Sequence, residues 1–346
     1  MRLLTLFAGA LITLVCVAQK DAMAKREAKV RKQLAKEKPY RAINLCNGAL
    51  GSEERPIFRV LLADAHNRIG EHGAAEIDAR KGLVAMPDHH EALLQLAIAE
   101  QGLGLLDSAI VHYHKVIGNK GASEINSRVR LAETYRSRKQ LDLALAQMDT
   151  AYTVLSQLDD GAPKQLLRIK AEFLAEKRDT AAARAAFSAA LVEQPDNPII
   201  LNSRAWFLYA AYGQHAAAIA DYDRAIKQNP NYSYAFNNRG WSKFKSGDTA
   251  GALKDIDRAR KKKPFNPYIY RNLGLIALQR GDTIGACSHF RRALQLNFTP
   301  VYGDEVERLV MEHCRGELSG PKPEVPSNAP DGPKRTPPPT RTNAPE

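Results

Sequence analysis

The chain has 346 residues, of which 44% are hydrophobic and 25% are charged. This composition supplies enough apolar side chains for one large core or for several small cores in a row, and it excludes a chain that is disordered throughout. The formal net charge of +12 at pH 7 favours acidic partners, lipid headgroups or nucleic acid, unless the basic residues simply form a solvated surface.

The amino-terminal residues are predicted to direct export. An almost unbroken apolar run extends from Leu3 to Ala18, and Ala22 and Ala24 are the small residues that a signal peptidase reads. As a helix the run would be about 24 Å long, shorter than the ~30 Å hydrocarbon core of a bilayer, so a permanent anchor is the weaker alternative. Lipidation at Cys16 is weaker still. We therefore expect residues 1–24 to be a signal peptide.

Residues 25–55 combine a charged stretch with a helical pattern. Ala42, Cys46 and Ala49 have helical spacing, but the segment from Lys25 to Lys38 is too charged for an ordinary core-facing helix. We expect an atypical amino-terminal helical cap or a degenerate repeat here.

The central part of the chain repeats with a period of 34 residues. Three columns of small or bulky residues recur without a gap: Ala218, Ala252 and Ala286; Tyr222, Ile256 and Phe290; Ala225, Ala259 and Ala293. Within one segment the columns are at i, i+4 and i+7, so they lie on one face of a helix. A second helix precedes each, and Gly247-Asp248 predicts the turn between the two. Pro230 and Pro264 separate successive helix pairs.

This pattern resembles the tetratricopeptide repeat, whose unit has Gly, Ala, a bulky residue, Ala and Pro at characteristic positions. The matching residues in one unit are Gly240, Ala252, Ile256, Ala259 and Pro264. In the preceding unit Trp206 replaces the Gly, which puts close helix packing in doubt at that point.

The resemblance implies an all-α fold, a helix-turn-helix solenoid wound as a right-handed superhelix with a carboxyl-terminal capping helix. About seven units are predicted: 56–89, 90–124, 125–163, 164–198, 199–232, 233–266 and 267–300. Residues 301–315 are amphipathic and are predicted to form the capping helix. Residues 316–346 contain nine prolines and few apolar side chains, which predicts a disordered tail.

The resemblance also implies a function, because the first helix of each such unit lines a concave surface that holds a peptide or a helix. By analogy, the groove positions are Phe207, Asn238, Trp241, Lys245, Asn272, Leu275 and Gln279. The alternative is that the aromatic residues among them pack against adjacent helices. We expect a non-enzymatic interaction scaffold whose partner is an unknown protein or peptide.

The sequence offers no support for catalysis. It contains no Gly-rich loop after a strand, no Ser, His and Asp arrangement and no metal-ligand spacing, so no catalytic residue, metal, cofactor or small-molecule substrate is predicted. Two other functions are open. One is a basic module that docks on lipid headgroups or nucleic acid through Lys25 to Lys38 and through Lys261, Lys262 and Lys263. The other is a structural subunit of an envelope assembly.

Two cysteines lie near the carboxyl-terminal end of the repeats. Cys287 and Cys314 are on consecutive predicted helices, and folding these helices back on each other brings the two residues within reach. They form either a disulfide or two buried thiols. The segments around them and around Tyr302 to Val306 resemble exported repeat proteins of Bacteroidota. This resemblance implies a bacterial periplasm or cell envelope, or secretion.

Overall fold

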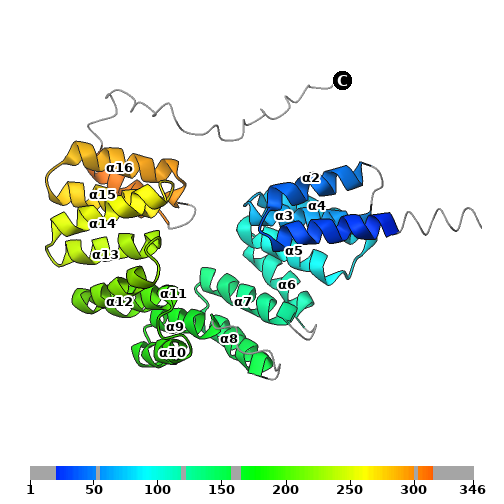
Figure 1. Ribbon diagram of the computed structural model, residues 1–346, viewed down its shortest axis with the longest axis horizontal. Coiled ribbons are helices and arrows are strands. Elements are labelled where there is room, and N and C mark those ends of the chain that lie inside the picture. Colours follow the sequence, from blue (N-terminus) through cyan, green and yellow to red (C-terminus); the bar gives the residue numbers. More distant parts are fainter. Residues whose placement is uncertain (1–20, 52–54, 118–121, 157–164, 300–302, 315–346) are drawn as a thin grey trace, which may run out of the picture. The chain divides into compact units, whose positions relative to one another are not determined.

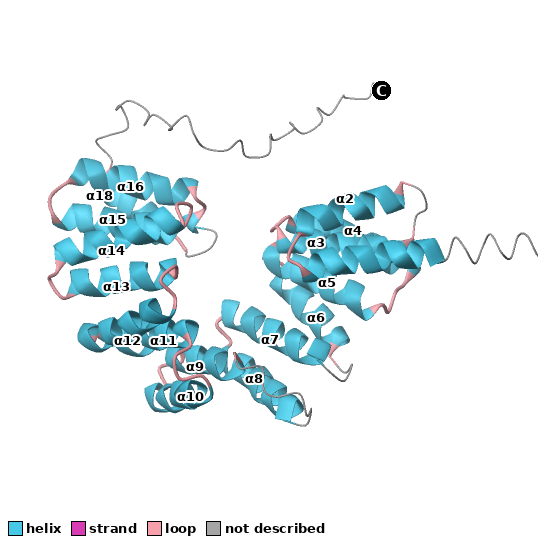
Figure 2. Cartoon of the chain, in the orientation of Figure 1, coloured by secondary structure: helices cyan, strands magenta, loops and turns pink. Residues whose placement is uncertain are grey.

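The computed structural model describes residues 21–51, 55–117, 122–156, 165–299 and 303–314, and Figures 1 and 2 show that the regular structure of this part is helical. The chain forms two compact units, residues 1–255 and 256–346, and each is described by itself. In the described ranges, no helix is long and apolar enough to cross a bilayer. Most of the predicted signal peptide and the whole predicted tail lie outside the described residues.

The first unit begins with a helix over residues 21–35, which packs on α2 (Pro39–Leu50). This helix buries Met23, Val30 and Leu34 on one face, in a cluster that also contains Cys46 and Phe58. Met23 belongs to the segment predicted to be a signal peptide. The core of this end of the molecule therefore begins before the predicted cleavage point.

The rest of the first unit consists of helix pairs. They are α3 (Pro56–Arg68) with α4 (His72–Ala85), α5 (His90–Gly102) with α6 (Leu106–Val116), α7 (Ala122–Ser137) with α8 (Leu141–Ser156), α9 (Leu166–Glu176) with α10 (Thr180–Glu193), and α11 (Pro198–Arg204) with α12 (His215–Gln228). Next comes α13 (Ser233–Lys245), while α14 (Thr249–Lys262) continues past the boundary of the unit. First helices of neighbouring pairs also contact each other, as α9 contacts α11 and α11 contacts α13.

Each pair turns at a residue with left-handed backbone geometry. These residues are Gly70, Gly104, Lys139, Arg178, Gly213, Gly247 and Gly281. Glycine adopts this geometry without strain, whereas Lys139 at φ 60° and Arg178 at φ 66° adopt it at a cost. The turn is thus a property of the repeat that persists even where glycine is missing.

The first helix of the fifth pair contains an extra residue. After Arg204 the helix continues as a π-helical turn, Ala205–Tyr209, and then as a 3₁₀ turn, Ala210–Tyr212. Its first residue, Pro198, is 35 positions before Ser233, whereas Ser233 is 34 positions before Pro267. A π-helical turn is the usual way for a helix to accommodate one additional residue. The extra residue lies within this turn.

This insertion corrects the expectation that Trp206 occupies the glycine position. With the extra residue taken into account, Ala205 is equivalent to Gly240, and Ala205 is fully buried. Ion pairs support the same register. Nε and Nη2 of Arg204 each lie 2.7 Å from an Asp221 carboxylate oxygen, and Arg239 contacts Asp255 at 2.6 and 2.7 Å. The two arginines are 35 positions apart, but the two aspartates are 34 positions apart.

The second unit contains the end of α14, followed by α15 (Pro267–Gln279), α16 (Thr283–Gln295) and α18 (Glu305–His313). In this unit α16 packs against both α15 and α18. Its core includes Phe290, Phe298 and Val306, all fully buried. A Cβ atom on Gly274 would lie 2.4 Å from Cε1 of Phe290, so the close contact of α15 with α16 requires glycine there.

Candidate peptide-binding surface

The residues predicted to line the groove fall in both units. Phe207 is in the π-helical turn, and Asn238, Trp241 and Lys245 are on α13 of the first unit. Asn272, Leu275 and Gln279 are on α15 of the second unit. Because these two groups of residues lie in different units, each group is described within its own unit.

The π-helical turn changes the expected role of Phe207. Its half-buried side chain packs against a core cluster that includes Phe187 and Leu208, as the alternative interpretation anticipated. Trp206, one residue after the buried Ala205, is the equivalent of Trp241. The sequence contains a signal for this register, because Arg-Ala-Trp at 204–206 matches Arg-Gly-Trp at 239–241 once a gap of one residue is allowed.

Two groove positions on α13 are half-buried and adjacent. The Asn238 side chain donates a hydrogen bond to Oδ1 of Asn202 on α11 at 3.1 Å and accepts one from Asn237 at 3.2 Å. Nζ of Lys245 lies 5.9 Å from the centre of the Trp241 ring, a cation–π contact. A chain of amides therefore joins two consecutive first helices beside an indole ring.

On α15 the predicted positions differ in exposure. Asn272 is fully buried, and its Oδ1 accepts a hydrogen bond from Nη1 of Arg271 at 2.9 Å. Leu275 is half-buried against the core of the second unit, and Gln279 is exposed. Because Asn272 has no exposed surface, we correct its expected role from a ligand contact to an internal hydrogen-bonding residue.

A charged cluster on α7 and α9 was missed by the sequence analysis. Arg136 of α7 forms an ion pair with Glu176 of α9, and its guanidinium carbon lies 5.5 Å from the centre of the Phe173 ring. Arg168 forms an ion pair with Glu172, four residues further along α9. The pair between Arg136 and Glu176 ties together the first helices of two consecutive helix pairs, whereas the pair between Arg168 and Glu172 lies within α9.

Glu133 differs from the other acids of this cluster. Its side chain is half-buried, and within the described residues no side chain forms a hydrogen bond or an ion pair with its carboxylate. Burial raises the pKa of Glu133, although the charges of Arg130, Arg136 and Arg168 oppose the shift. A positively charged group of a ligand could therefore form an ion pair with the Glu133 carboxylate.

These observations define a column of equivalent residues, each of which directly follows the small residue of a first helix. We call this set the groove column: Glu133, Glu172, Trp206 and Trp241 follow Ala132, Ala171, Ala205 and Gly240. All four lie in the first unit, on consecutive first helices from α7 to α13. Glu172 is buried, and the other three are half-buried. The column changes from acidic to aromatic between α9 and α11.

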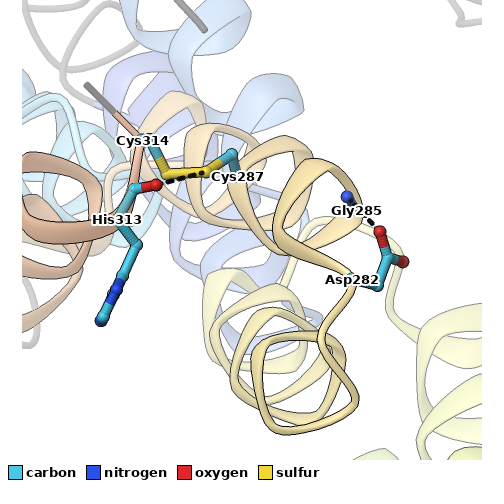
Figure 3. Close-up of a disulfide and its surroundings, with 5 residues drawn as sticks. All are labelled: Asp282, Gly285, Cys287, His313 and Cys314. Atoms are coloured by element: carbon cyan, nitrogen blue, oxygen red, sulfur yellow. Dashed lines mark hydrogen bonds between the residues drawn. A yellow bond between two sulfur atoms is a disulfide. The ribbon is translucent and has the colours of Figure 1, made fainter. Parts of the chain in front are cut away.

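The capping helix is attached to the last helix pair (Figure 3). Cys287 of α16 and Cys314, which follows α18, form a disulfide with their Cα atoms 5.7 Å apart. Nε of Arg271 on α15 lies 3.1 Å from Oε2 of Glu305 on α18. Cys46 is a buried free thiol, and burial together with the charge of Asp78 raises its pKa to about 12. Across the described ranges, no group of His, Cys, Asp and Glu could hold a metal ion.

Comparison with known families identifies the repeat. The family model for the tetratricopeptide repeat matches residues 171–233 and 237–297. These two segments are tetratricopeptide repeats. The chain has the all-α helix-turn-helix architecture of tetratricopeptide solenoids. Tetratricopeptide repeat proteins are generally scaffolds for protein–protein interaction and are generally non-enzymatic.

Solved structures with TM-scores above 0.5 support this fold. The APC/C hetero-tetramer Cut9-Hcn1 matches with a TM-score of 0.52 and 11% identity, over 79% of this chain and 52% of that chain, so the chain spans about half of its length. The human IFIT1 dimer with m7Gppp-AAAA matches with a TM-score of 0.56 and 14% identity, over 83% and 73%. A tetratricopeptide repeat protein from Parabacteroides merdae has a TM-score of 0.46 and 15% identity, over 83% and 98%. No curated protein matches the chain.

Proposed function

We propose that this protein is an exported, non-enzymatic scaffold that holds a segment of another protein against the groove column of the first unit. The general role of tetratricopeptide repeat proteins supports binding of a protein. The groove column itself is the observation that carries the proposal. Its half-buried side chains have both accessible surface and fixed positions, which is the combination that a recognition surface needs. The apolar run from Leu3 to Ala18 and the disulfide support export.

The chemistry of the column specifies the bound segment. Glu133 forms no ion pair within the described residues, and two of the three arginines whose charges act on it, Arg136 and Arg168, are already paired with glutamates. A basic side chain of the ligand would satisfy Glu133. Trp206 and Trp241 offer large, rigid surfaces that suit an apolar or aromatic side chain. The proposed ligand is therefore a segment with a basic residue followed or preceded by an apolar one.

The test compares variants of the groove column with matched variants on second helices. The purified protein captures partners from an envelope extract, and each partner is then reduced to the synthetic segment that binds. Glu133→Gln and Trp241→Ala should each weaken binding of that segment about tenfold or more. The controls are Glu193→Gln on α10 and Tyr152→Ala on α8, both exposed residues outside the column.

The controls should bind as the natural protein does. Equal binding by the column variants would overturn the proposal, and so would equal loss in the controls. A bound segment without any basic residue would remove Glu133 from the proposed site and leave the tryptophans.

The stability of Glu133→Gln separates a binding role from a structural one. Because burial raises the pKa of Glu133 in the folded state, its ionised form costs stability above that pKa, and the cost disappears as the pH falls through it. Glu133→Gln should therefore keep or raise the melting temperature at pH 7, and the difference should vanish below about pH 4. A variant that melts lower at pH 7 would show that Glu133 stabilises the fold instead.

A further inference from the structure

The helix over residues 21–35 has a basic row on its outer face. Lys25, Lys29, Lys32 and Lys36 are all exposed, and their spacing of i, i+4, i+7 and i+11 places them in one row along the helix. Lys36 follows the last helical residue but still donates its backbone N–H to the Lys32 carbonyl at 3.2 Å. We call these four residues the lysine row. It extends about 16 Å along the helix.

The opposite face fixes the orientation of this helix. Met23, Val30 and Leu34 are buried in the core cluster shared with α2 and α3, so the lysine row must point away from the unit. The row is therefore held on the surface by packing and does not depend on a flexible segment.

The positive charge of the lysine row is not neutralised from within the described residues. No ion pair or side-chain hydrogen bond forms to Lys25, Lys29, Lys32 or Lys36 in that part of the chain. Asp21 lies one turn before Lys25 without forming an ion pair with it. Glu27, the nearest acid within the helix, is occupied by Arg31 at 2.9 Å, and Arg31 also contacts Glu91. The row thus presents four ammonium groups to an external anion.

We propose that the lysine row docks this end of the protein on the anionic surface of a lipid bilayer. Two observations favour lipid over nucleic acid. The row is a straight line of lysines, which act as hydrated point charges and suit mobile phosphate headgroups, while Arg31 on the same helix is already paired with Glu27 and Glu91. In addition, Met23 belongs to the core at this end, and in a chain that retains residues 1–24 the apolar run from Leu3 to Ala18, which has the chemistry of the bilayer core, ends seven positions before Lys25.

Other basic residues of the chain are less suited to this role. Lys261 forms an ion pair with Asp257 at 2.8 Å, and Lys261, Lys262 and Lys263 follow one another in sequence, so they point in different directions. Lys254 is exposed on the same helix as Lys261. These four residues make a matched control, because neutralising them changes the net charge of the protein by the same amount.

The experiment is co-sedimentation of the purified protein with phosphatidylcholine vesicles, with and without phosphatidylglycerol, at low and high salt. A lysine near an anionic leaflet contributes about a fivefold gain in partitioning. The variant K25Q/K29Q/K32Q/K36Q should therefore lose about 100-fold or more in partitioning to anionic vesicles. The control K254Q/K261Q/K262Q/K263Q should lose much less. Helicity from circular dichroism checks that both variants fold.

Partitioning to neutral vesicles measures what the apolar run contributes. It should be the same in the natural protein, the lysine-row variant and the control variant. Equal binding of anionic vesicles by the lysine-row variant and the natural protein would overturn the proposal. An equal loss in both variants would also overturn it, because net charge alone would then explain binding. Loss of binding to an RNA or DNA oligonucleotide with unchanged vesicle binding would assign the row to nucleic acid. Capture of the groove ligand is independent of all of these outcomes.

Discussion

The two ends of the described chain are closed by different kinds of contact. At the amino-terminal end, the helix over residues 21–35 buries Met23, Val30 and Leu34 against two neighbouring helices. At the carboxyl-terminal end, α18 is nine residues long, and Val306 is its buried residue. There the disulfide between Cys287 and Cys314 and the ion pair between Arg271 and Glu305 supplement the apolar contact.

The difference follows from how much apolar surface each helix can bury. Burial of one large side chain contributes about 1.5–3 kcal/mol, so three such side chains can hold a helix that one cannot. A helix that is held by its apolar face has its outer face available, and at the amino-terminal end that face carries the lysine row. A short helix with little to bury is instead attached covalently.

The largest effect is expected from removing the disulfide. The two cysteines are separated by 27 positions, and closing a loop of this size stabilises the folded state by about 3.5 kcal/mol in the chain-entropy model. Without reductant, the double variant Cys287→Ser/Cys314→Ser should melt at the lower temperature at which the reduced natural protein melts. A scan with and without reductant measures this effect. If the reductant has no effect on the natural protein, α18 is held without the disulfide.

Alkylation of the native protein provides an internal control for that experiment. At pH 8 the Cys46 thiol should remain unmodified before and after reduction, because burial and the charge of Asp78 raise its pKa to about 12. Cys287 and Cys314 should react after reduction. Peptide mapping by mass spectrometry distinguishes the three sites, and modification of Cys46 would show that the whole amino-terminal end had opened.

The next largest effect is expected from Leu34→Ala at the amino-terminal end. Leu34 is 4% exposed, and truncating a buried leucine costs about 2.5 kcal/mol. The variant should melt earlier and should lose protection from hydrogen exchange first in α2 and α3. Ala35→Ser, an exposed change at the next position, is the control. A loss confined to α16 and α18 would contradict the assignment of Leu34 to this core.

A smaller effect is expected from weakening α16, the helix that holds the cap. The Asp282 side chain accepts a hydrogen bond from the Gly285 backbone N–H at 2.8 Å, and such an N-cap contributes about 1 kcal/mol (Figure 3). Asp282→Ala should therefore destabilise the reduced protein as well as the oxidised one. Asp282→Asn is the matched control, since asparagine also caps helices. Equal losses in both variants would point to the charge rather than to the hydrogen bond.

The smallest effect is expected from the ion pair at the amino-terminal end. Arg31 contacts both oxygens of Glu91 at 2.9 and 3.0 Å, but both side chains are partly exposed. Glu91→Gln should cost about 0.5 kcal/mol at low salt and less at high salt. Melting temperatures across a salt series measure this. A cost comparable to that of Leu34→Ala would show that charge, not apolar burial, closes this end.

The buried residues of the repeated core were predictable from the sequence. Ala218, Ala252 and Ala286 are fully buried, and so are Tyr222, Ile256 and Phe290, because a 34-residue period returns each residue to the same environment. The turn predicted at Gly247-Asp248 is also present, with left-handed geometry at Gly247 (φ 92°). These features depend on local chemistry that is copied from one unit to the next.

The groove column was less predictable. A gapless comparison assigned Phe207 and missed Trp206, because the period of the second helices continues unchanged across an extra residue in the first helix. The burial of Asn272 could not be predicted from the sequence, because the exposure of a polar side chain depends on its hydrogen-bond partner, here Arg271. Glu133 was missed for a similar reason. It forms no ion pair in the described residues, and two of its arginine neighbours, Arg136 and Arg168, are paired with other acids, which only the folded structure reveals.

The disulfide has a consequence for the order in which the protein comes apart. A repeat protein is held by contacts between neighbours, so it frays from an end rather than from the middle. Cys287 and Cys314 keep α18 tethered to α16 even when their noncovalent contacts open, so that a frayed α18 closes again quickly. Fraying is thereby directed to the opposite end. Under heat, pulling force or proteolysis in an oxidising environment, the molecule should unravel from the helix over residues 21–35, and a reductant should remove that preference.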